Sequence, residues 1–97
     1  MTVLQIEHEI SDFATWKAAF DRDPVKRKES GVRRYRVLRP IDDPGYIKVD
    51  LEFDSQGRAE AFLSALREMW KSGEAAPALK GSPRVQLVEE VQSEDLT

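Results

Sequence analysis

The sequence predicts an α+β domain in which strand, helix, strand, strand, helix and strand follow one another. Two segments, residues 3–10 and 46–53, alternate apolar and polar residues with the period of two of a half-buried strand. A third segment, from Ser55 to Trp70, repeats apolar residues with the helical period of about 3.6. A chain of 97 residues has room for one core of this size. We therefore expect a ferredoxin-like βαββαβ sandwich, with a four-stranded antiparallel sheet and two helices on one face.

The first strand and first helix are predicted over residues 3–10 and from residue 13 onward. Ser11 or Asp12 supplies the N-cap oxygen. Either Asp23-Pro24 ends this helix, because the residue before proline avoids the α region, or a kinked basic turn continues it to Ser30. The inward strand residues are Leu4, Ile6, His8 and Ile10, with Gln5, Glu7 and Glu9 outward, and the apolar helix stripe is Phe13, Trp16 and Phe20.

The second and third strands are predicted over 32–39 and 46–53, joined by a turn at residues 40–45 that is rich in proline, aspartate and glycine. Tyr35 and Val37 then point inward while Arg34 and Arg36 point outward. The third strand has the cleanest alternation in the chain.

The second helix is predicted from Ser55 to Trp70, with Gly73 as its breaker. A connection over residues 71–83 leads to a fourth strand over 84–91, in which Val85, Leu87 and Val91 share one face. Residues 1–92 then form a single domain, and residues 93–97 a flexible C-terminal tail.

Composition excludes several classes of function. Hydrophobic residues make up 40% and charged residues 34% of the chain, as in a soluble globular protein. No apolar run approaches the roughly 18 residues of a membrane span. The absence of cysteine excludes disulfides, thiolate nucleophiles and iron–sulfur clusters, and the N-terminus lacks the plan of a signal peptide. We expect a cytoplasmic protein with no cofactor and no metal.

The charges are unevenly distributed. Seven of the 15 basic residues lie between Lys26 and Arg39, whereas Asp50, Glu52 and Asp54 mark an acidic strand. This polarity could steer an anionic ligand toward the protein. It could equally pair a basic strand with an acidic one across the sheet, which is the interpretation we favour.

The pattern of aromatic and acidic residues resembles the dimeric α+β barrel superfamily over residues 3–91. It is most similar to small bacterial members related to antibiotic-biosynthesis monooxygenases and to proteins named cyclases. The matching positions are His8, Asp12, Trp16, Phe20-Asp21, Gly31, and Glu52-Phe53-Asp54-Ser55 leading into Ala59, Ala61 and Phe62.

The resemblance implies a homodimer whose sheets face each other, with a small-molecule cavity in each subunit between sheet and helices. The cofactor-independent monooxygenases of the group use asparagine, tryptophan and tyrosine side chains around an acidic substrate. This chain contains no asparagine.

Five residues are candidates for a site. His8, the only histidine, could act as a catalytic base or could be a satisfied core histidine. Trp16 and Trp70, and likewise Tyr35, could line a ligand cavity or simply fill the core. Arg27 could clamp a carboxylate or remain a solvated surface side chain. A metal site at His8 is disfavoured because Glu7 and Glu9 alternate to the opposite face.

Nucleic acid is not an expected partner, although RNA-recognition modules share this order of elements. Those modules stack bases on aromatic residues of the central strands. Here Lys48 occupies such a position, and Asp50 and Glu52 would repel phosphate.

Three hypotheses about function follow. The first is a small-molecule-binding homodimer that acts as a cofactor-independent monooxygenase-like or cyclase-like enzyme, with His8 as the base. The second is a non-catalytic ligand-binding or regulatory module. The third is a structural dimer with a filled core.

Overall fold

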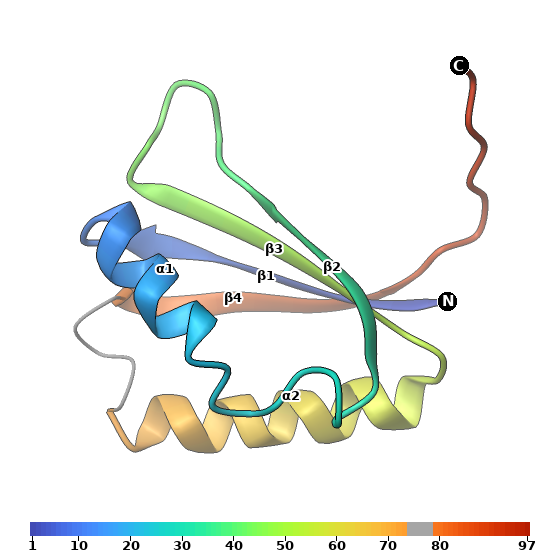
Figure 1. Ribbon diagram of the computed structural model, residues 1–97, viewed down its shortest axis with the longest axis horizontal. Helices are drawn as coiled ribbons and strands as arrows, with labels where there is room; N and C mark the ends of the chain where they lie inside the picture. The colour runs from blue at the N-terminus through green and yellow to red at the C-terminus, as the bar shows by residue number, and fades with distance from the viewer. Residues whose placement is uncertain (74–78) are drawn as a thin grey trace.

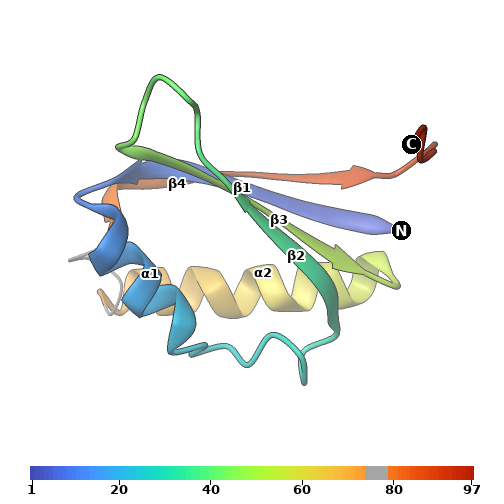
Figure 2. The same cartoon turned by 45° about the horizontal axis from the view of Figure 1, so that its top comes forward.

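The computed structural model describes residues 1–73 and 79–97. Its elements follow the predicted order: β1 (Thr2–Ile10), α1 (Phe13–Asp21), β2 (Val32–Leu38), β3 (Tyr46–Phe53), α2 (Gln56–Lys71) and β4 (Leu79–Glu89). The strands form one antiparallel sheet in the order β2-β3-β1-β4. Both helices cover the same face of this sheet (Figures 1 and 2). The predicted ferredoxin-like fold is therefore confirmed.

The core lies between the sheet and the two helices, as the alternation predicts. Strands β1 and β3 pair with Leu4 opposite Leu51 and Ile6 opposite Val49, so apolar residues meet on one face. These central strands contribute most of the buried residues, since each has a neighbour on both sides. The buried core residues are Leu4, Ile6, Ile10, Trp16, Val32, Ile47, Val49, Leu51, Phe53, Ala59, Phe62 and Leu63.

Both helices begin at a side-chain cap. The Asp12 carboxylate accepts from the backbone N–H of Thr15 at 2.8 Å, and the Ser55 hydroxyl accepts from the N–H of Arg58 at 3.3 Å. Each of these bonds satisfies a donor that the helix itself leaves free. The N-cap expected at Ser11 or Asp12 is thus Asp12.

Helix α1 ends at Asp21, so the alternative of a helix continuing to Ser30 is wrong. Asp23 adopts a left-handed backbone with φ of 53° directly before Pro24, and a series of hydrogen-bonded turns leads to Gly31, where φ is 98°. Aspartate tolerates this conformation better than most residues, and glycine adopts it without steric cost. We call residues 22–31 the α1–β2 loop. It runs alongside α2 (Figure 1).

A bulge at Arg33 sets the register of β2. Val32 pairs with Phe53 and Arg34 with Glu52, so Arg33 has no partner of its own on β3. Because of this extra residue, Val32 and Tyr35 can both lie on the helix side. Tyr35 is nevertheless 44% exposed, because β2 is an edge strand. Tyr35 therefore lies on the helix-facing side of the sheet, as predicted, but its side chain is not buried in the core as expected.

Strand β4 begins at Leu79, five residues before the predicted Arg84, and ends at Glu89. Gly81 and Pro83, which suggest a turn in the sequence, lie within the strand. A register shift accommodates them, because Glu7 pairs with Arg84 but Glu9 pairs with Lys80. An edge strand tolerates a bulge with a positive φ at Gly81 and a proline without an N–H.

Two further predictions concern the residues just after and just before β4. Val91 lies beyond the strand and is 88% exposed, so its predicted place on the inward face is wrong. Most of the predicted 71–83 connection, residues 74–78, lies outside the described residues.

The outer face of the sheet pairs its charges across strands. Arg34 contacts Glu52, and Arg36 contacts Asp50, each at 3.0 Å. Tyr46 donates a hydrogen bond to Glu7 at 2.8 Å. The favoured interpretation of the uneven charge, pairing between a basic and an acidic strand, is confirmed for these pairs. Among the described residues, no helix is long and apolar enough to cross a membrane.

Candidate functional site

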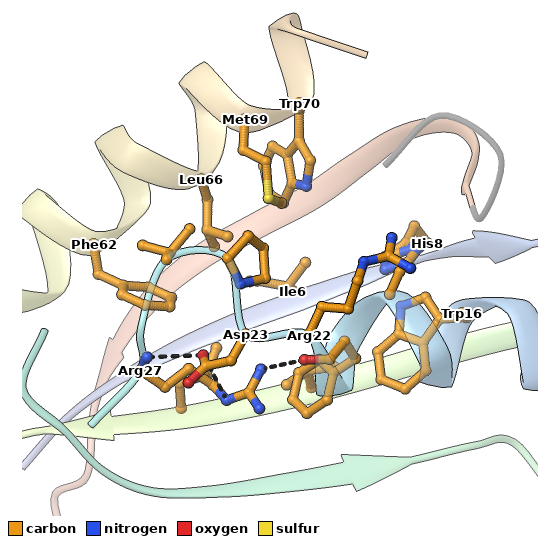
Figure 3. A pocket seen from close by; sticks show the side chains of 16 residues that line it. Ile6, His8, Trp16, Arg22, Asp23, Arg27, Phe62, Leu66, Met69 and Trp70 are labelled. Carbon is orange, nitrogen blue, oxygen red and sulfur yellow. Dashed lines mark hydrogen bonds and ion pairs between the residues drawn. The ribbon is translucent and has the colours of Figure 1, made fainter. Parts of the chain in front are cut away.

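A cavity of about 140 Å³ lies between the sheet, the two helices and the α1–β2 loop (Figure 3). Its existence argues against the hypothesis of a completely filled core. The sheet supplies one wall, α1 and the loop a second, and α2 the third. The lining residues are Ile6, His8, Val49 and Leu51 from the sheet, Trp16, Ala19, Phe20, Arg22, Asp23, Pro24, Val25 and Arg27 from α1 and the loop, and Phe62, Leu66, Met69 and Trp70 from α2.

His8 is the buried polar side chain of this wall, with 6% of its surface exposed. Its Nδ1 lies 3.3 Å from the backbone oxygen of Glu9. Because a carbonyl oxygen only accepts, this contact assigns the proton to Nδ1 and leaves Nε2 with a free lone pair. Burial lowers the pKa of His8 from 6.5 to about 4, so the imidazole is neutral at pH 7.

The bulge in β4 lies opposite His8. Three residues of β4, 81–83, occupy the space between the partners of Glu7 and Glu9, so His8 has no paired residue on that side. Bulges of this kind often lie next to functional sites, where they redirect a side chain. The bulge makes β4 hard to recognise in the sequence, and it lies directly beside His8, the candidate base.

Aromatic rings form the α1 side of the cavity. Trp16 stacks on Phe20 with ring centres 4.8 Å apart and planes inclined by 21°. The centre of the His8 ring lies 6.4 Å from that of Trp16. Trp70 faces this group from the last turn of α2 (Figure 3). His8, Trp16 and Trp70 therefore line one cavity, and their functional roles remain predictions.

Arg27 is neither a solvated side chain nor a free clamp. Its Nη1 donates to the Phe20 carbonyl oxygen at 2.8 Å, its Nε lies 3.5 Å from the Asp23 carboxylate, and its guanidinium lies 3.9 Å from the centre of the Phe20 ring. The backbone N–H of Arg27 also donates to Asp23 at 2.9 Å. Arg27 thus fastens the α1–β2 loop to the end of α1, and Tyr35 contacts it from outside the cavity at 5.0 Å.

Arg22 belongs to no motif or apolar stripe that marks it as a site residue in the sequence. This residue is the C-cap of α1 and lines the cavity. Its side chain extends toward the end of the cavity where His8 and Trp16 lie (Figure 3). Within the described residues, its guanidinium has no hydrogen-bond or ion-pair partner. A basic residue immediately after an amphipathic helix was the signal that could have identified it.

No family model and no curated protein matches this chain by sequence. Solved structures match it closely in fold. SnoaB, a cofactor-independent oxygenase from Streptomyces nogalater, aligns with a TM-score of 0.74 at 12% identity, over 95% of this chain and 94% of its own. A protein of unknown function from Nitrosomonas europaea aligns with a TM-score of 0.69 at 19% identity, over 99% and 94% of the two chains.

An antibiotic biosynthesis monooxygenase also aligns, with a TM-score of 0.69 at 13% identity, over 95% of this chain and all of its own. The fold defines a ferredoxin-like α+β domain. More narrowly, the domain has the fold of the antibiotic-biosynthesis-monooxygenase group, as the sequence resemblance predicted. At these identities the likeness establishes the fold and leaves the activity to the site itself.

Proposed function

We propose that the protein binds a small organic molecule in the cavity and transforms it without a bound cofactor, as a monooxygenase-like or cyclase-like enzyme. The observation that carries the proposal is a buried, neutral His8 beside Trp16 in a cavity whose lining is mostly apolar. Apolar cavities with a few convergent polar groups are the usual form of a small-molecule site. The fold shared with a cofactor-independent oxygenase supports the same conclusion.

In this proposal the Nε2 atom of His8 accepts a proton from the ligand. A methylene group acidified by an adjacent carbonyl or phenol would lose this proton and become a carbanion, which reacts with O₂ directly. Addition of O₂ and loss of one water convert the CH₂ group into a C=O group, so the atoms balance without a metal or flavin. The absence of asparagine from the chain means that any stabilisation of the anion comes from other groups here.

The test uses a panel of single-ring phenols and aromatic acids that carry a methylene group next to the ring or to a carbonyl. A thermal-shift screen identifies the compounds that stabilise the protein, and an oxygen electrode then records their O₂ consumption. We expect H8A to fold and to lose turnover by a factor of about 10²–10⁴, the usual contribution of a general base. Undiminished turnover in H8A would exclude His8 as the proton acceptor, and a panel that stabilises nothing would argue against the binding site.

A second function, a ligand-binding or regulatory module without catalysis, is favoured by the scarcity of reactive groups. The Asp23 carboxylate is engaged by Arg27, and His8 is a weak base at a pKa of about 4. A stabilising compound that is recovered unchanged after prolonged incubation in air would support this module over the enzyme.

We also propose that two copies associate through the outer face of the sheet. The cross-strand ion pairs cover Asp50 and Glu52, whose side chains are only 15% and 18% exposed although the face is open. Leu38 pairs with Lys48 and so lies on this outer face, where it is 43% exposed. Paired charges around apolar residues suit a two-fold interface, in which each patch meets itself.

Light scattering tests this association. We expect the wild-type mass to be twice that of the chain, and L38E to shift it toward the monomer. I41E is the matched control, because Ile41 is fully exposed in the turn between β2 and β3, away from the sheet face. A wild-type monomer at tens of micromolar, or an equal effect of both variants, would refute the proposed interface.

A further inference from the structure

We infer that the ligand of this cavity is a monoanion with one aromatic ring, and that Arg22 binds its anionic group. The inference rests on the proposed small-molecule site and specifies the class of molecule that it would accept. Three observations support it: the charges of the lining, the volume of the cavity and the placement of Arg22.

The charges of the lining leave one positive group unmatched. Among the described residues, those of the lining with a formal charge at neutral pH are Arg22, Asp23 and Arg27. The Arg27 guanidinium lies with its Nε 3.5 Å from the Asp23 carboxylate, which also accepts a hydrogen bond from the Arg27 backbone N–H at 2.9 Å. The Arg22 guanidinium has no such partner among the described residues. A ligand with a single negative charge would neutralise the site, whereas a cation would meet repulsion.

The volume of the cavity limits the apolar part of the ligand. A closed apolar cavity of about 150 Å³ accommodates benzene, and the cavity here is about 140 Å³. Trp16, Leu66 and Met69 provide apolar contacts of the kind that an aromatic ring prefers, whereas the two faces of Phe20 are covered by Trp16 and Arg27. A second fused ring exceeds this volume and would lie at the open side of the cavity, outside the apolar lining.

The placement of Arg22 suits an anionic group at the end of the cavity near His8. The Arg22 side chain extends from the end of α1 toward His8, and the apolar part of the lining lies on the other side, at Phe62 and Leu66 (Figure 3). A carboxylate or phenolate at Arg22 would leave the ring inside the cavity. The Nε2 lone pair of His8 is then available to a hydroxyl or to an acidic C–H of the same ligand.

Isothermal titration with benzoate, benzamide and 2-naphthoate tests the inference on the wild-type protein. Benzamide has nearly the shape of benzoate and no charge, and 2-naphthoate adds a second ring. We expect benzoate to bind roughly tenfold more tightly than benzamide, as one hydrogen-bonded charge pair at a partly exposed site would give. We expect 2-naphthoate to bind more weakly than benzoate.

Variants of Arg22 show whether this residue carries the preference. In R22Q the affinity for benzoate should fall to about that for benzamide, while the affinity for benzamide stays unchanged. In R22K part of the preference for benzoate should remain. R67Q is the control, because it changes the net charge by the same amount as R22Q. Arg67 is next to Leu66 on α2, but its side chain is exposed and is not part of the cavity lining.

The outcomes separate the two proposals. Equal binding of benzoate and benzamide, or an unchanged preference in R22Q, would overturn the role of Arg22 and leave the small-molecule site intact. Tighter binding of 2-naphthoate would overturn the limit of one ring. If none of the three compounds binds at millimolar concentration, both the ligand class and the binding function are refuted.

Discussion

Acidification should destabilise the wild-type protein more than the H8Q variant. The pKa of His8 is about 4 in the folded chain, because burial disfavours the charged imidazole, against 6.5 when it is exposed. Between pH 6.5 and pH 4, His8 therefore binds a proton in the unfolded chain but stays mostly neutral in the folded chain. Stability contributed by the neutral His8 is full above pH 6.5 and falls as the pH drops toward 4.

The magnitude follows from the difference between the two pKa values. At 1.36 kcal/mol for each pKa unit, a lowering from 6.5 to about 4 is worth about 3 kcal/mol in total, of which about 2 kcal/mol is lost by pH 5. Domains of this size have a free energy of unfolding of about 5–15 kcal/mol, so the loss is readily measured. Glutamine at position 8 keeps an amide donor for the Glu9 carbonyl and does not titrate.

Urea unfolding at about pH 7.5 and pH 5 measures the effect, and the difference between wild type and H8Q removes the contribution of the carboxylates that the two chains share. Because His8 is the only histidine, its imidazole C–H resonance also reports the pKa directly by NMR. An equal loss of stability in both chains, or a resonance that titrates near 6.5, would refute the reasoning about burial.

Four other measurements test the packing of the site. W16A should lose about 3–5 kcal/mol of unfolding free energy, because it removes a buried, stacked ring, and urea unfolding would show a smaller loss if the cavity collapses. R27Q should lose about 1.5–3 kcal/mol with its bond to the helix carbonyl, and an effect near zero would contradict the fastening of the loop. G31A should cost about 1–2 kcal/mol, since φ is +98° there and the new Cβ would lie 2.9 Å from Arg58. Bound benzoate should raise the pKa of His8 above 4, and an unchanged NMR titration would place the anion elsewhere.

The parts of the fold that repeat a regular period could be predicted from the sequence. Strand β3 alternates without interruption, and this alternation predicts residues 46–53, the bounds that the structure gives. The predicted bounds of helix α2, Ser55 to Trp70, differ from the observed ones by one residue at each end, because its stripe of apolar residues is sustained over three turns. Such regular elements form wherever local preference and burial agree.

Strand β4 and Tyr35 were harder to predict because tertiary context overrides local signals there. Gly81 and Pro83 are turn residues in isolation, yet an edge strand with a bulge tolerates both. Tyr35 obeys the alternation of its strand, but alternation assigns a face and says nothing about how far the helices extend over that face. Burial at an edge depends on neighbours distant in the sequence.

The aromatic residues of the candidate site could be predicted from the sequence, whereas the roles of its charged residues could not. His8, Trp16 and Trp70 lie on faces that periodicity can assign, and the structure brings all three to one cavity. The roles of Arg22 and Arg27 depend instead on the left-handed backbone at Asp23, which directs the loop back over the helix end. Nothing in the spacing of two arginines distinguishes the one that fastens the loop from the one left open to a ligand.

The low pKa of His8 makes Arg22 decisive for the choice between enzyme and binding module. Proton transfer from a phenol-like acid of pKa about 10 to an imidazole of pKa about 4 costs about 8 kcal/mol, half of the roughly 16 kcal/mol barrier of an enzyme with about ten turnovers per second. An adjacent guanidinium lowers the pKa of an acid by about 1–3 units and so recovers about 1.4–4 kcal/mol of that cost. In an enzyme the bound monoanion gains a further negative charge when His8 accepts its proton, so its interaction with Arg22 strengthens and R22Q should lower kcat as well as affinity. In a binding module the charge of the ligand does not change, and R22Q should weaken affinity alone.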